Sequence, residues 1–385
     1  MSGVNIAAAM QSSTPEALRE RGSFKWTAGK PGQIGAFVAE SDLPMAPAVR
    51  SAVAEALGRG LTGYLPEHLE RAVGAACAGF QQARFGWQLD PDSVRVLPNV
   101  LSAFAFTAEH LVDPDTPIVL PTPAYMPFLV KPGLMHRELR TVPMRRTNGR
   151  YLLDPDELTA ALDGGGLLIL VNPHNPTGQV ATRDELLAIA GAVERTGSTV
   201  FADEIHSPVV FPGAGHLPYA ALSPMTAAHT VTGFSASKGW DLPGLTCAQL
   251  VMTSPVHRKR WEDTHFVAKV GTSPLGAVAA CAAYTAGVDH LEEVVRYLDD
   301  ARMLFARSMA NALPDVPYTM PEATYIHWLD LRPLGVPPAE VADRVGVLGT
   351  DGADCGAPGF LRLTLATSHP IVTETVHRLS RLSPG

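Results

Sequence analysis

The chain contains only six lysines, and one of them, Lys238, lies in the stretch FSASKGWDLPGL at 234–245. Small Ser, Ala and Gly residues surround it, and no acidic residue closely precedes it. Arginine, which is abundant in this chain, could replace a surface lysine. It could not replace an amine that must lose its proton and attack a carbonyl, because guanidinium stays charged. Lys238 is therefore a candidate nucleophile, and the alternative is a lysine that merely donates to a backbone carbonyl.

Two other polar stretches directly follow apolar runs. NPHNPTG, which contains Asn175, follows GLLILVN, and Asp203 comes directly after STVFA. Taken singly, the first could be only a turn and the second only a helix cap. Pyridoxal phosphate (PLP), however, needs a lysine amine, a carboxylate at its ring nitrogen, a donor to its phenolic oxygen and an anion cradle. These needs match Lys238, Asp203, Asn175 and the hydroxyls of Ser235 and Ser237.

The elements that must position these residues are short apolar runs separated by helical patterns. The runs lie at 116–121, 166–172, 198–204, 229–234 and 247–252. Each has the length of a strand buried on both faces, and helical stretches such as 182–197 separate several of them. This alternation predicts an α/β fold with a mainly parallel sheet covered by helices, in which ligands bind at the carboxyl ends of the strands.

The pattern changes after about residue 285. A long amphipathic helix at 289–313 leads into a strand-like run at 324–331, a helix around 338–346 and a strand-like run at 360–366. We therefore predict a large domain over 44–285. A smaller α+β domain is predicted to combine the N-terminal arm, 1–43, with 286–385.

Composition excludes several classes of function. The net charge of −8 and the absence of any basic run argue against nucleic-acid binding. No apolar run reaches membrane-spanning length, and the N-terminus lacks the basic region of a signal peptide, so a cytoplasmic protein is expected. The histidines and cysteines show no metal-ligand spacing, so no metal site and no disulfide framework is expected. The four cysteines are Cys77, Cys247, Cys281 and Cys355.

Together, the stretches NPHNPTG, ADEIHSPVVF, SASKGWDLPGL and GFLRLTLA resemble fold-type I PLP enzymes of aminotransferase class I/II. The chain is most similar to the cystathionine β-lyase subfamily of the MalY/PatB type, from residue 37 to the C-terminal helix. The resemblance implies a large domain with a mostly parallel seven-stranded sheet between helices and a small α+β C-terminal domain. It also implies a homodimer whose active sites are shared between the subunits.

The resemblance assigns roles to the cofactor-binding positions. Lys238 matches the lysine that forms the Schiff base, Asp203 the acid at the pyridine nitrogen and Asn175 the amide at the phenolic oxygen. Tyr125 matches the aromatic ring stacked on the cofactor, although an ordinary core or loop aromatic is the alternative. Tyr64 matches the tyrosine that reaches the neighbouring subunit's phosphate, although its position also suits a surface tyrosine.

Further positions match the cofactor's phosphate site and the substrate site. The backbone amides of Val100 and Leu101 match the phosphate cradle at a helix N-terminus. Arg362 matches the arginine that binds the substrate α-carboxylate in a bidentate pair, and the backbone near Ala39 matches the loop that contacts the same carboxylate. The alternative for Arg362 is a surface arginine on an edge strand.

Several residues depart from the family pattern. Asn99 stands where the family usually has glycine, and asparagine tolerates the left-handed conformation expected there. The usual Asn three residues after the lysine is Asp241, and Thr246 stands where the family often has a basic or polar residue. Cys355 replaces an aromatic residue and His290 replaces a tryptophan. These departures do not affect the residues expected to bind PLP and make it an electron sink. They do leave the identity of the substrate's thiol portion undetermined.

The leading hypothesis is a C–S β-lyase that cleaves an L-cysteine S-conjugate, cystathionine-like or a natural-product thioether, to thiol, pyruvate and ammonia. His206 supports it, because a typical aminotransferase often has tyrosine there. The alternatives are an aminotransferase and an enzyme of lincosamide-like antibiotic biosynthesis that couples decarboxylation to oxidative deamination of an S-conjugate. One alternative belongs to a different functional class: a regulatory member of the family that binds another protein and keeps only vestigial activity.

Overall fold

The structure, a computed structural model, describes residues 5–382. Its strands are β1 (Ile34–Gly35), β2 (Val94–Leu97), β3 (Ile118–Thr122), β4 (Leu139–Pro143), β5 (Arg145–Thr147), β6 (Arg150–Leu152), β7 (Leu167–Val171), β8 (Thr199–Asp203), β9 (Thr230–Phe234), β10 (Ala248–Met252), β11 (Ile326–Asp330), β12 (Val347–Leu348), β13 (Thr350–Asp351) and β14 (Phe360–Thr364). Its α-helices are α1 (Ile6–Gln11), α2 (Pro15–Glu20), α3 (Phe24–Thr27), α4 (Pro47–Gly58), α5 (Glu67–Phe85), α6 (Val100–Phe106), α7 (Met126–Leu134), α8 (Pro155–Ala161), α9 (Arg183–Thr196), α10 (Pro224–His229), α11 (Pro255–Asp263), α12 (Pro274–Tyr284), α13 (Val288–Ala312), α14 (Val341–Val345) and α15 (His369–Leu379).

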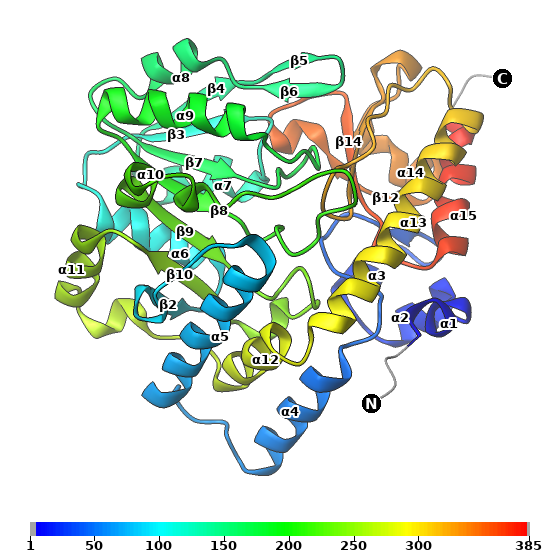
Figure 1. Cartoon of the computed structure of the whole chain (residues 1–385). Helices are drawn as coiled ribbons and strands as arrows, with labels where there is room; N and C mark the ends of the chain where they lie inside the picture. The colour runs from blue at the N-terminus through cyan, green and yellow to red at the C-terminus, as the bar shows by residue number, and fades with distance from the viewer. Residues whose placement is uncertain (1–4, 383–385) are drawn as a thin grey trace.

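A seven-stranded sheet forms the centre of the molecule, in the order β2-β10-β9-β8-β7-β3-β4. Strand β10 runs antiparallel to both of its neighbours, and the other pairs are parallel. Every residue of β7 and β9 is buried, as expected for strands covered on both faces. The predicted α/β fold with a mostly parallel seven-stranded sheet is therefore confirmed, and Figure 1 shows helices on both sides of it.

Helix α9 illustrates how local sequence sets the covering helices. Thr182 accepts a hydrogen bond from the backbone of Glu185, and the Glu185 carboxylate bonds back to the Thr182 backbone, which forms a capping box. Gly197 ends the helix in the left-handed conformation, at φ 62°. The apolar face between these caps packs onto the sheet with α8.

The segment after residue 286 forms α13, α14, α15 and a three-stranded sheet in the order β11-β14-β13. The N-terminal segment joins it, because β1 pairs in parallel with β12. Figure 1 shows α1 and α2 beside α15 and one end of α13. The predicted domain limits, 44 and 285, stay a prediction, and residues 1–4 and 383–385 of those ranges lie outside the described residues. Within 5–382, no helix has both the length and the apolar character needed to cross a bilayer.

Candidate active site

Lys238 lies in the turn after β9, and its amine faces the N-terminal segment. Its Nζ donates a hydrogen bond to the Ala39 carbonyl over 2.7 Å, and the Tyr325 hydroxyl approaches the same oxygen at 3.4 Å. Burial lowers the pKa of Lys238, and the nearby Arg362 adds to this effect. Three carboxylates act in the opposite direction: Asp241, Glu40 and Asp203. A larger share of the Lys238 amine is therefore neutral than in a solvated lysine.

Asp203 ends β8 beside this turn and is buried. Its Oδ1 accepts a hydrogen bond from the Ile205 N–H over 3.1 Å. Burial raises the pKa of the carboxyl to about 7, and this effect outweighs the hydrogen bond from Ile205. Asp203 forms no salt bridge with any residue of 5–382, so a cationic N–H group would satisfy it.

Arg362 lies in β14, the central strand of the small sheet, and only 2% of it is exposed. This placement rules out a surface arginine on an edge strand. Its Nη1 donates to Asn175 Oδ1 over 3.2 Å, and its Nη2 donates to the Phe37 carbonyl over 2.6 Å and to Thr350 Oγ1 over 3.3 Å. No carboxylate of 5–382 pairs with Arg362, and its Nε lacks a partner there. A buried guanidinium that has no carboxylate partner can bind an anionic ligand.

The start of α6 forms another part of the site. Asn99 caps this helix, because its Oδ1 accepts from the Ser102 N–H over 2.8 Å. Its φ of −158° is extended, so the expected left-handed conformation is wrong: the side chain serves as a cap instead of easing a turn. The next two residues, Val100 and Leu101, line the active-site cavity.

The two predicted serines lie differently. Ser237 lines the cavity, whereas Ser235 does not, and Ser235 Oγ donates to the Cys247 carbonyl over 2.9 Å. The two hydroxyl oxygens are 2.7 Å apart. Ser235 is therefore placed to hold Ser237, and Ser237 is the one that can face a ligand.

A cavity of about 580 Å³ brings most of the predicted residues together. Tyr125, the N-cap of α7, and His206 also line it, and burial lowers the pKa of His206 to about 3, so its ring is neutral. Tyr64 does not line it and is 97% exposed. The predicted residues in the cavity wall are Ala39, Val100, Leu101, Tyr125, Asn175, Asp203, Ser237, Lys238 and Arg362. Their individual roles stay predictions.

Comparison with known proteins places the chain in a family. The profile of the aminotransferase class I and II family matches residues 34–379. The chain belongs to the aminotransferase class I and II family. Cystathionine β-lyase of Corynebacterium glutamicum is 30% identical over 372 residues, which cover 95% of this chain and 98% of that protein. Cystathionine β-lyase PatB of Bacillus subtilis is 29% identical, with 89% and 90% covered.

A solved structure agrees with this assignment. The crystal structure of a protein from Corynebacterium diphtheriae, provisionally designated a PLP-dependent β-cystathionase, superposes with a TM-score of 0.91. It is 31% identical, and the match covers 97% of this chain and 98% of that one. The predicted membership of aminotransferase class I/II and the fold-type I architecture are therefore confirmed.

Sequence reasoning missed three residues that line the active-site cavity. Phe24 and Phe37 line the cavity and meet edge to face, with ring centroids 5.3 Å apart. Thr350, which also lines it, donates through Oγ1 to the Phe37 carbonyl over 2.9 Å. Phe37 is the first residue of the range over which the chain resembles the family, and that position was a usable signal. Nothing in the sequence placed Phe24 or Thr350 there.

Proposed function

We propose that this protein is a PLP-dependent C–S β-lyase that cleaves an L-cysteine S-conjugate to a thiol, pyruvate and ammonia. One observation carries the proposal. A single cavity presents the Lys238 amine, the buried Asp203 carboxyl and an Arg362 guanidinium that pairs with no carboxylate of the described residues. An amino acid needs such an arrangement: an anchor for its carboxylate and a base for its Cα proton.

The residues present fit the proposed cofactor. Lys238 would hold its aldehyde carbon, Asp203 its ring nitrogen, Asn175 its phenolic oxygen, and the Val100 and Leu101 amides with Ser237 its phosphate. Asp203 supports this fit most directly, because a carboxyl whose pKa burial raises to about 7 gains most from a cationic N–H partner. When bound, PLP supplies an electron sink for the negative charge that develops at the substrate Cα.

The chain's own residues then divide the work. Arg362 binds the substrate α-carboxylate and so fixes the direction of the Cα–H bond. Lys238 accepts the Cα proton at Nζ, and its lowered pKa increases the neutral, basic form. The Ala39 carbonyl, 2.7 Å from Nζ, accepts a hydrogen bond from the resulting ammonium. The neutral His206 adds no competing charge beside the base.

Relatives and surface features support the finer parts of the proposal. The relatives named cystathionine β-lyases, at 29–33% identity, favour elimination as the reaction branch. We also propose a cytoplasmic homodimer with shared sites, in which Tyr64 reaches the phosphate of the other subunit. The 97% exposure of Tyr64 in the single chain supports this proposal. Figure 1 shows α4, a few residues before Tyr64, extending from the body of the molecule.

A product assay tests the reaction branch. The protein is incubated with PLP and L-cystathionine, or with smaller cysteine S-conjugates, with and without a keto acid. Pyruvate and free thiol in equal amounts without a keto acid are expected, and Lys238→Ala should abolish both. Product formation that depends on a keto acid would instead indicate an aminotransferase, and oxygen uptake would indicate oxidative deamination. Either result would overturn the lyase proposal.

A further inference from the structure

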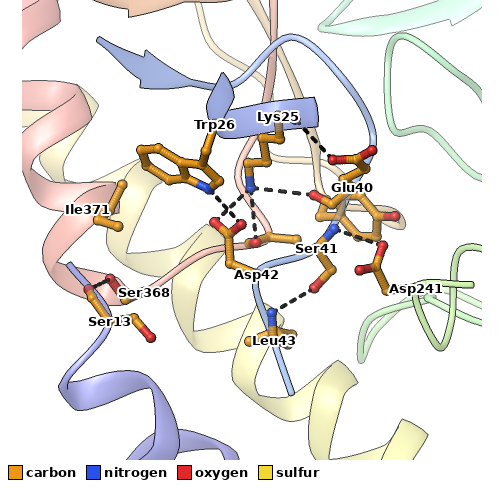
Figure 2. A network of polar contacts seen from close by, with 12 residues as sticks. Ser13, Lys25, Trp26, Glu40, Ser41, Asp42, Leu43, Asp241, Ser368 and Ile371 are labelled. Atoms are coloured by element: carbon orange, nitrogen blue, oxygen red, sulfur yellow. Dashed lines mark hydrogen bonds and ion pairs between the residues drawn. The ribbon is translucent and has the colours of Figure 1, made fainter. Parts of the chain in front are cut away.

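Asp241 lies three residues after Lys238 and faces the N-terminal segment. Its backbone is left-handed, at φ 54°, a conformation that asparagine and aspartate tolerate better than most residues. Its Oδ1 accepts a hydrogen bond from the Ser41 N–H over 2.9 Å, and Figure 2 shows the carboxylate directed at this amide. Ser41 is two residues from Ala39, whose carbonyl accepts from Lys238. Asp241 thus touches the segment that holds the Lys238 amine.

The same segment is fixed from its other side by a buried ion pair. Lys25 Nζ lies 2.9 Å from Asp42 Oδ2, and their side chains are 1% and 3% exposed. The Trp26 ring N–H donates to Asp42 Oδ1 over 2.7 Å, and the Asp42 N–H donates to the Ala366 carbonyl over 2.8 Å. Figure 2 shows the side chains of Lys25 and Trp26 directed at Asp42, with Asp241 beyond Ser41. Residues 39–42 therefore have little freedom to follow the Lys238 amine if it moves.

The charges around Lys238 come from several elements. Glu40 of this segment and Asp203 of β8 favour its ammonium form together with Asp241, whereas Arg362 of β14 opposes it. Two histidines and one tyrosine also lie near. Burial lowers the pKa of His206 and of His290 and raises that of Tyr325, so all three side chains are neutral near pH 7. His290 and Tyr325 line, with Asp241 and Lys238, a cavity of about 10 Å³ that has room for about one water molecule.

We propose that Asp241 is a positioning residue that holds residues 39–42 against the Lys238 amine and, through its negative charge, favours the ammonium form of Lys238. The inference rests on the proposed role of Lys238 as cofactor anchor and base. An amide oxygen at position 241 could also accept the Ser41 N–H, so the hydrogen bond alone does not need a carboxylate. What a carboxylate adds is charge. Burial raises the pKa of Asp241, whereas the Ser41 N–H and the cations Lys238, Lys25 and Arg21 favour its charged form. In the pKa of Lys238, Asp241 is the strongest influence opposing burial.

The consequence concerns the moment when Lys238 is free of cofactor and carries the proton taken from the substrate Cα. The proton moves from Cα to Nζ, which becomes an ammonium that donates to the Ala39 carbonyl. The Asp241 charge stabilises this ammonium and so favours the transfer. It also delays the return of the neutral amine that would attack the cofactor's aldehyde-derived carbon and displace the substrate nitrogen from it. Asp241 would thus balance proton abstraction against cofactor recapture.

The experiment measures Lys238 without requiring turnover. The full-length chain, freed of cofactor by hydroxylamine treatment and dialysis, is treated with trace acetic anhydride between pH 6 and 10, and acetylation of the Lys238 peptide is followed by mass spectrometry. Only the neutral amine reacts. In Asp241→Asn, which keeps an oxygen for the Ser41 N–H, the profile should move to lower pH. Acetylation of Lys238 at pH 7.5 should rise at least about threefold.

Controls separate charge from structure. Asp354→Asn removes another carboxylate from the wall of the large cavity, one that does not act on Lys238, and should leave the profile unchanged. Asp241→Ser, which also removes the charge, should move the profile in the same direction as Asp241→Asn, and it tests the inference if the first variant folds poorly. An unchanged profile in both Asp241 variants, or an equal change in Asp354→Asn, would overturn the inference. Neither outcome depends on whether the protein is a lyase.

Discussion

Replacing Arg362 by lysine should separate carboxylate binding from folding. The guanidinium can offer a substrate carboxylate two parallel N–H bonds, whereas an ammonium keeps the charge but loses this fork. A hydrogen bond to a charged group contributes about 1.5–3 kcal/mol, so losing one should lower kcat/KM about 10- to 150-fold. Three protein oxygens, on Asn175, Phe37 and Thr350, compete for the shorter side chain and increase the loss.

The same contacts set the cost to stability. The Phe37 carbonyl keeps its hydrogen bond from Thr350 in the variant, so it is not left unpaired. The melting temperature should therefore fall by only a few degrees. Arg332→Lys is a matched control, because Arg332 makes a two-pronged contact with Asp330 in the same small domain but is largely exposed. The assay follows pyruvate and thiol release together with the PLP absorbance. A kcat/KM for Arg362→Lys within threefold of wild type, or loss of the folded state, would refute the carboxylate role.

Four further outcomes are expected. Borohydride reduction of the PLP-loaded protein and peptide mapping should place the label on Lys238, and a label on another lysine would contradict the assignment. Mixed Tyr64→Phe and Lys238→Ala subunits should regain activity that neither variant has alone, whereas a fully active monomer in ultracentrifugation would exclude shared sites. In the cofactor-free chain, Asp203→Asn should be more stable than wild type by about 4 kcal/mol above pH 7, and this difference should vanish below pH 4. Because the folded pKa of Asp203 is near 7 and its unfolded pKa is near 4, the wild-type fold loses stability as the pH rises from 4 to 7. A pH-independent difference in urea unfolding would contradict this. Lys25→Met should cost about 3–5 kcal/mol in the same assay, because it leaves the buried Asp42 carboxylate without an opposite charge. Lys30→Met breaks an exposed ion pair and should cost less than about 1 kcal/mol; equal costs would refute the distinction.

Five strands of the large sheet, β3, β7, β8, β9 and β10, were predictable because burial on both faces leaves a strong local signal, whereas the edge strands β2 and β4 were not predicted. The run expected at 229–234 is β9, at 230–234, and the run expected at 166–172 is β7, at 167–171. The polar residues that follow these strands, Asn175 and Lys238, were found for the same reason. A polar side chain directly after a fully apolar strand can be recognised without knowledge of the partner elements.

Other parts of the site depend on contacts between distant segments, which local patterns do not encode. Thr350 and Phe37 meet through a hydrogen bond that joins positions 313 residues apart. Asn99 was expected in a left-handed turn because the family usually has glycine at this position. Its conformation is set instead by the start of α6. The Ser102 N–H has no carbonyl partner within the helix, and the Asn99 side chain accepts its hydrogen bond.

The scarcity of lysine, which singled out Lys238, would also have singled out Lys25. Lys25 is buried and Lys238 is partly buried, and both hold the segment between them: Lys238 bonds to the carbonyl of Ala39 and Lys25 to the carboxylate of Asp42. Close packing reinforces this arrangement, since a Cβ on Gly35 would lie 1.8 Å from the Lys25 carbonyl oxygen.

Residues 37–42 therefore join both ends of the chain to the reactive amine. Their carbonyls contact Arg362 through Phe37 and Lys238 through Ala39, and the Asp42 amide bonds to the C-terminal segment at Ala366. A substrate carboxylate that binds Arg362 through Nη2 competes with the Phe37 carbonyl for that nitrogen. Binding of the amino acid would thus loosen this segment on the side of Arg362, while Asp241 and Lys25 hold it on the side of Lys238. A variant that weakens the Lys25 anchor should consequently raise KM more than it lowers kcat.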